Sequence, residues 1–120
     1  MDILLETVVE TMASAGYSKR ERHDVRLVME EAVVNAIKHG HCSKSGKRVV
    51  VDCLVAADAV FARVEDEGPG FNPHTLPDPR DPANWERTCG RGVFLIQSLS
   101  TWAQYNARGN CVTFCKRRAA

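Results

Sequence analysis

Residues 19–40 carry the pattern that most constrains the fold, because apolar side chains recur there at helical spacing without a break. The repeating positions are Val25, Val28, Met29, Ala32, Val33, Ala36 and Ile37. Positions three and four apart share one face of an α-helix, so the segment predicts an amphipathic helix that packs on a core and ends near Gly40. Ser18 and Glu21, at its start, have the spacing of a capping box.

Further elements are expected on both sides of this helix along the chain. A first amphipathic helix is indicated over residues 2–15, where the apolar positions are Ile3, Leu4, Val8 and Met12. A last helix is expected at about residues 92–100. Segments rich in β-branched and apolar residues predict four strands, at 48–56, 59–66, 101–107 and 111–116. The sum is one domain over residues 1–120 with an α/β fold. We expect an α+β two-layer sandwich, with a mixed or mostly antiparallel sheet covered on one face by about three helices.

Composition narrows the classes of function. Lys and Arg number 16 against 15 Asp and Glu, and the resulting net charge of +1 argues against a nucleic-acid binder. The basic tail at 116–118 is interpreted as a solvated strand end. We find no membrane-length apolar run and no signal-peptide pattern, so we expect a cytoplasmic protein. The five cysteines are interpreted as reduced and structural, and a zinc site at His39, His41 and Cys42 is disfavoured because a distant fourth ligand is missing.

Glu31 and Asn35 lie one turn apart on the long helix, with Lys38 near them, on a different face from the apolar stripe. We expect these side chains to line a cleft. An Asn carboxamide oxygen suits Mg²⁺, and a Glu one turn earlier can accept a proton from a hydroxyl or water that attacks a γ-phosphate. The spacing alone is also compatible with a solvated helix face.

A glycine motif, Asp66-x-Gly68-x-Gly70, comes directly after a predicted strand. The Asp carboxylate offers only acceptors, so it can accept a hydrogen bond from the exocyclic amine of adenine and discriminates against guanine, which presents a carbonyl there. An ordinary turn would also use such residues.

A second glycine motif, Gly90-Arg91-Gly92, opens the last predicted helix. Free backbone N–H groups at a helix start can bind phosphate, and Arg91 would add positive charge. An ordinary helix start is equally compatible with this motif in isolation. The three motifs together, each on the element that its role requires, predict an ATP site.

Residues 72–89 separate the two glycine motifs and contain prolines at positions 73, 77, 79 and 82. Prolines at this density exclude both a helix and a central strand. A loop of this length in a small domain is typically a lid, a binding loop or a disordered segment.

In this order the motifs resemble the N, G1 and G2 boxes of the GHKL ATPases, the superfamily of DNA gyrase, the heat-shock chaperones, MutL and the sensor histidine kinases. The short chain and the phrase at residues 31–40, Glu-Ala-Val-Val-Asn-Ala-Ile-Lys-His-Gly, are most similar to the bacterial anti-sigma-factor serine kinases. The resemblance implies the Bergerat fold, with ATP and Mg²⁺ bound between helices and sheet and with residues 72–89 as the ATP lid.

The resemblance also implies roles for individual residues. Asn35 matches the Mg²⁺ ligand, Glu31 the general base and Asp66 the adenine-binding Asp, whereas Asn110 stands where the superfamily often has a Thr that supports the adenine. The implied nucleotide-binding residues are Asn35, Lys38, His39, Asp66, Gly68, Gly70, Gly90, Arg91, Gly92, Val93 and Asn110.

The implied function is a serine/threonine protein kinase that phosphorylates a small antagonist protein, binds a sigma factor and switches between these partners. A homodimer is compatible with the family, and no direct nucleic-acid or membrane contact is expected. The alternative is a non-catalytic module that sequesters a partner when ATP is bound, but Glu31 favours the enzyme, because such a module needs no base beside its metal ligand. A split histidine kinase fits less well, since no phosphoacceptor helix with its own His precedes the first motif.

Overall fold

The structure is a computed structural model that describes residues 2–40, 48–67 and 91–119, with the backbone alone for residues 38–40 and 91. In chain order its elements are α1 (Asp2–Ser14), α2 (Lys19–Gly40), β1 (Val49–Val55), β2 (Ala59–Asp66), α4 (Arg91–Leu99), β3 (Trp102–Tyr105) and β4 (Cys111–Arg117). The sequence predicts each of these helices and strands, with ends that differ by no more than about two residues.

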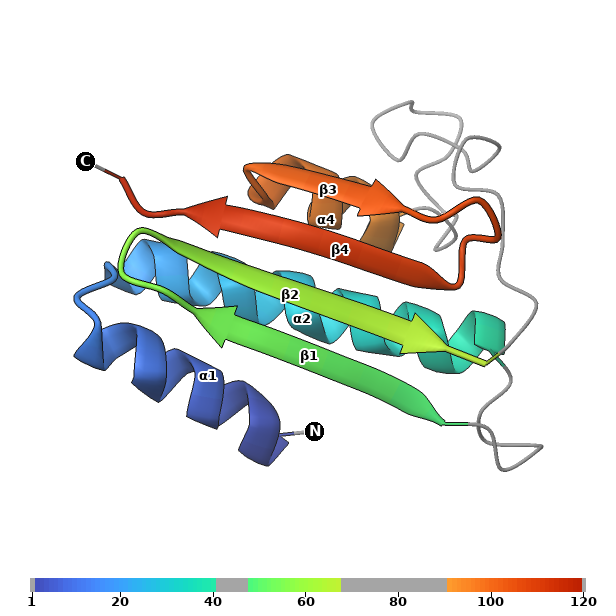
Figure 1. The fold of residues 1–120 in the computed structure, drawn as a ribbon, viewed down its shortest axis with the longest axis horizontal. Helices are drawn as coiled ribbons and strands as arrows, with labels where there is room; N and C mark the ends of the chain where they lie inside the picture. Colours follow the sequence, from blue (N-terminus) through green and yellow to red (C-terminus); the bar gives the residue numbers. More distant parts are fainter. Residues whose placement is uncertain (1, 41–47, 68–90, 120) are drawn as a thin grey trace.

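The four strands form one sheet in the order β1-β2-β4-β3, and every pairing among them is antiparallel. The helices lie together on one face of this sheet, with α2 between α1 and α4 (Figure 1). No helix of the described residues covers the opposite face. This confirms the predicted two-layer α/β sandwich and resolves its sheet, in the strands described, as antiparallel.

Side-chain alternation along β2 places the core between the two layers. Val60, Ala62 and Val64 are buried toward the helices, whereas Phe61 and Arg63 point to the open face. The largest fully buried side chains come from both layers: Phe114, Leu5, Met12, Met29 and Ile96. The same alternation carries Asp66, at the end of β2, into the helix-facing layer.

The capping box at the start of α2 is confirmed. The Ser18 backbone N–H donates to Glu21 Oε1 at 2.8 Å, and the Glu21 N–H donates to Ser18 Oγ at 3.1 Å. Just before it, α1 is ended by Gly16, whose φ of 91° lies in the left-handed region that glycine adopts readily. These two signals set the sharp turn between α1 and α2.

Two helix faces differ from the sequence prediction. Leu5 is buried in α1 together with Val8 and Met12, whereas Ile3 is 84% exposed and Leu4 is 36% exposed. At the far end of α2, Ile37 is 42% exposed although it continues the apolar stripe. Helical spacing identifies faces of a helix, but it does not tell how far along the helix the opposite layer extends.

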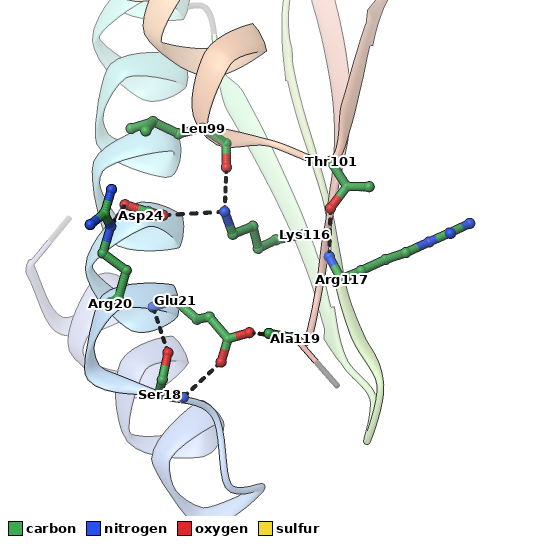
Figure 2. A network of polar contacts seen from close by, with 9 residues as sticks. All are labelled: Ser18, Arg20, Glu21, Asp24, Leu99, Thr101, Lys116, Arg117 and Ala119. Atoms are coloured by element: carbon green, nitrogen blue, oxygen red, sulfur yellow. Dashed lines mark hydrogen bonds and ion pairs between the residues drawn. The ribbon is translucent and has the colours of Figure 1, made fainter.

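The basic tail is a solvated strand end at Arg117 and Arg118, whose side chains are exposed, but Lys116 differs from that interpretation. Lys116 Nζ donates to Asp24 Oδ2 at 3.2 Å and to the Leu99 carbonyl at 2.8 Å (Figure 2). Arg118 Nη1 donates to the Ala15 carbonyl at 3.0 Å. Because β4 is an inner strand of the sheet and Lys116 points to its helix-facing side, the Lys116 side chain bonds to the helix layer.

The cysteines agree with their predicted role as far as the structure describes them. Cys53, Cys111 and Cys115 are free thiols, and burial raises the pKa of each. Cys42 and Cys89 lie outside the described residues.

Candidate functional site

The start of α4 lies directly against the middle of α2. A Cβ atom added at Gly92 would lie 2.8 Å from Asn35 Nδ2 and 2.9 Å from Glu31 Oε2. Carbon atoms do not approach polar atoms so closely, so a larger residue here would displace the ends of the Asn35 and Glu31 side chains. The fold therefore brings the first and third sequence motifs together, as their proposed roles require.

Asp66 lies at the end of β2 and is only 5% exposed. Its backbone is held on both sides by one residue of the β3–β4 turn. The Asp66 N–H donates to the Asn110 carbonyl at 2.8 Å, and the Asp66 carbonyl accepts from Asn110 Nδ2 at 2.8 Å. These two hydrogen bonds fix the backbone of Asp66, and with it the position of the carboxylate on the helix-facing side of the sheet.

Asn106 holds Asn110 in turn. Its Oδ1 accepts from the backbone N–H groups of Asn110 and Cys111 at 3.0 and 3.1 Å, and its Nδ2 donates to Asn110 Oδ1 at 2.6 Å. Gly109, between them, has a φ of 73°. The Asn110 carboxamide is therefore engaged with Asp66 and Asn106, and it acts on the candidate site through the Asp66 backbone.

The first and second motifs meet across a small cavity. Its polar lining comes from Asn35, Asp66, Tyr105 and Asn110, and its apolar lining includes Val64 and Val112. The cavity measures about 10 Å³, enough for about one water molecule. The cavity therefore brings a buried carboxylate and a carboxamide together beside apolar walls.

Tyr105 reaches the same cavity from β3. Burial raises the pKa of its hydroxyl, and the nearby Asn35 side chain acts in the opposite direction. The hydroxyl is therefore neutral at physiological pH and can orient the Asn35 carboxamide.

Two positioning residues, Tyr105 and Asn106, escaped the sequence prediction. Asn106 had a usable signal, since an Asn that opens an Asn-x-x-Gly turn often bonds the backbone two or more residues further on. Tyr105 had none, because its relation to Asn35 arises only when the sheet, with β3, packs against the helix layer, with α2.

The described residues fit a magnesium nucleotide in the chemistry of their donors. Asn35 offers a carboxamide oxygen, Glu31 a carboxylate and Asp66 a buried acceptor, and the first N–H groups of α4 favour an anion. No cluster of three His, Cys, Asp or Glu side chains that could hold a metal is present among the residues described. A Mg²⁺ ion held by one protein ligand and by phosphates needs no such cluster.

Several predicted site residues lie wholly or partly outside the described part of the chain. Gly68, Gly70 and Gly90, the lid at 72–89, and His41 and Cys42 of the disfavoured zinc site are not described. Lys38, His39 and Arg91 have a described backbone in α2 and α4 only. Val93 is 6% exposed, so its side chain belongs to the core beneath the start of α4.

Among the described helices, none combines the length and apolar character that a membrane crossing requires.

Comparison with known proteins agrees with this geometry. Residues 2–116 match the family model described as the histidine kinase-like ATPase domain. The serine-protein kinase RsbW of Listeria monocytogenes serovar 1/2a is 30% identical over 91 residues, which cover 71% of this chain and 58% of that protein. RsbW of Staphylococcus aureus is 26% identical over 100 residues, covering 78% and 63%. An anti-sigma F factor of Clostridium perfringens is 34% identical over 62 residues, covering 52% and 43%. In each case the match extends over less than two thirds of the relative's length.

Proposed function

The chain belongs to the histidine kinase-like ATPase domain family, and on this basis we propose that it binds Mg²⁺ and ATP and phosphorylates a serine or threonine of a small antagonist protein. We further propose that it holds a sigma factor in one state and the antagonist in the other, in the cytoplasm. The names of its relatives, serine-protein kinase and anti-sigma F factor, support these partners.

One observation carries the nucleotide part of the proposal. Glu31 and Asn35 converge on Gly92 without room for a side chain there, while Asp66 faces Asn35 across a shared cavity. If the three motifs were only an ordinary turn, a solvated helix face and an ordinary helix start, they would have no reason to lie close together. Their meeting supports a single site that engages the base, the metal ion and the phosphates.

Each residue then has a separable task in the proposed reaction. Asp66 accepts a hydrogen bond from the adenine amine, and Asn35 contributes an oxygen to Mg²⁺, which when bound would neutralise charge on the phosphates. Glu31 accepts the proton of the attacking hydroxyl. The new bond joins that hydroxyl oxygen to the γ-phosphorus, the bond between the γ-phosphorus and the β–γ bridging oxygen breaks, and ADP leaves.

The open face of the sheet supports a homodimer as the assembly. Leu54, Phe61, Cys115 and Trp102 pair across the four strands in one row, and three of them are exposed large apolar residues. The next row carries the exposed ion pair of Asp52 and Arg63. Across a twofold axis the two charges can exchange partners, so the face is self-complementary.

Light scattering should give twice the monomer mass for the wild-type protein. Phe61→Lys places a charge in the apolar row and should give the mass of the monomer.

A phosphotransfer assay separates the kinase from the sequestering module. Glu31→Gln keeps the size and hydrogen bonding of the side chain, so ATP binding should stay nearly intact. Phosphorylation of the small antagonist protein should fall by about two to four orders of magnitude, the range typical of a general base. Asn35→Ala and Asp66→Asn are the matched variants that should lose binding as well as turnover.

The opposite results have a definite meaning. If the wild-type protein binds ATP and its partner but transfers no phosphate, the sequestering module is the correct function. Transfer by Glu31→Gln at the wild-type rate would remove Glu31 from its role as base.

A further inference from the structure

The geometry of the candidate site depends on the axial position of α4 relative to α2. Glu31 and Asn35 belong to α2 and Gly92 to α4, and a Cβ atom added at Gly92 would lie 2.9 Å from Glu31 Oε2 and 2.8 Å from Asn35 Nδ2. Between these helices, Ile96 of α4 is fully buried in the apolar core that α2 also lines. Interdigitated apolar side chains already favour one axial position of α4 along α2. A directional polar contact between the elements would define that position more narrowly.

Lys116 of β4 supplies a directional contact of this kind at the C-terminal end of α4. Its Nζ donates to the carbonyl of Leu99, the last residue of α4, at 2.8 Å and to Asp24 Oδ2 of α2 at 3.2 Å (Figure 2). One ammonium group therefore joins the C-terminus of α4, the second turn of α2 and the sheet. A cation at the C-terminal end of a helix also interacts favourably with its dipole.

Burial makes this bridge stronger than a surface ion pair. The Lys116 side chain is 20% exposed and the Asp24 side chain 8% exposed. Charge-assisted hydrogen bonds in such surroundings have short distances and defined directions. The segment after α4 is fixed to β4 as well, since the Thr101 N–H donates to the Cys115 carbonyl at 2.8 Å and the Arg117 N–H to Thr101 Oγ1 at 2.8 Å.

We propose that Lys116, with Asp24, is a positioning residue for the nucleotide site, because it sets the axial position of α4 on α2. Leu99 and Gly92 are seven residues apart, about 10 Å along a rigid helix, so a shift at the bridge is transmitted to the Gly92 contact. A displacement of the order of 1 Å in a binding constellation can cost a large factor in affinity or rate. The inference rests on the proposed nucleotide function.

The test compares Mg-ATP affinity in two variants of the C-terminal tail. Lys116→Met keeps much of the apolar stem and removes the ammonium group, and it should weaken ATP binding by about tenfold. Arg118→Met is the matched control, since Arg118 bonds the Ala15 and Ala57 carbonyls and lies over Tyr17, away from α4. It should lower thermal stability but leave ATP affinity within about twofold of the wild type. Calorimetric titration is made at a temperature where circular dichroism shows each variant fully folded.

Two further variants keep the test decisive. Lys116→Arg retains donors for both acceptors and should restore affinity to within about threefold of the wild type. Lys116→Met combined with Asp24→Asn leaves no unpaired buried charge, so it should fold even if the single variant does not. This double variant should still bind ATP weakly, because the Leu99 carbonyl has lost its donor.

The outcomes distinguish the inference from the proposed function. Wild-type protein that binds no ATP contradicts the proposed function itself. Wild-type binding with equal affinity in the double variant overturns the positioning role, as would an equal loss in Arg118→Met, which would show a general effect of stability.

Discussion

At the scale of single residues, the site depends on the absence of one methyl group. Gly92 meets Asn35 and Glu31 so closely that a Cβ atom cannot be added without moving a side chain. In a helix, Ala is usually more stable than Gly by about 0.5–1 kcal/mol. Position 92 is thus a place where the requirement of the site opposes the helical preference.

Gly92→Ala should therefore separate binding from folding. We expect ATP affinity to fall by about tenfold or more, because the methyl group displaces the Asn35 and Glu31 side chains from their present positions. Thermal stability should change little, since the gain in helix propensity offsets the local crowding. Ser98→Ala, at an exposed position of the same helix, is the control and should alter neither quantity. Unchanged ATP affinity in Gly92→Ala would mean that the close contact plays no part in the site.

The sequence could predict the residues whose role depends on local spacing. Glu31 and Asn35 share a helix face, and Asp66 follows a strand, so both placements are visible without a structure. Asn106 acts through a local turn that its Asn-x-x-Gly sequence could have indicated, whereas the role of Tyr105 requires the sheet to pack against α2. Long-range contacts of this kind leave no periodic trace in the sequence.

At the scale of elements, helix faces are harder to predict than helix boundaries. Leu4 and Leu5 are the same residue type in the first turns of α1, and the spacing to Val8 and Met12 admits either as a core residue. The structure buries Leu5 at 1% exposure and leaves Leu4 at 36%. The choice depends on how α1 lies against α2 and β1, which spacing alone does not encode.

The two leucines give a matched test of this orientation. Leu5→Ala should lower the free energy of unfolding by about 2–5 kcal/mol, the range for a buried leucine truncated to alanine. Leu4→Ala should cost less than about 1 kcal/mol, because its side chain keeps contact with water in the folded state. Urea denaturation of both variants measures these differences. A larger loss for Leu4→Ala would show that the opposite face of α1 packs on the core.

At the scale of the whole molecule, the two layers explain why three distant motifs form one site. Glu31 and Asn35 come from the helix layer, Asp66 comes from the inner face of the sheet, and Gly92 begins the helix that packs beside α2. Lys116 crosses from the sheet to both helices at the other end (Figure 2). The fold class was predictable because each motif lay on a predicted element, whereas the bridge at Lys116 became visible only in three dimensions.

The most direct test of this account is calorimetric titration of the protein with ATP and with GTP in the presence of Mg²⁺. The buried Asp66 acceptor should favour adenine, so we expect ATP to bind with a Kd well below about 1 mM and GTP to bind at least about tenfold more weakly. Asp66→Asn should remove that preference along with most of the affinity. Equal affinities for the two nucleotides, or no binding of ATP at millimolar concentration, would contradict the nucleotide site.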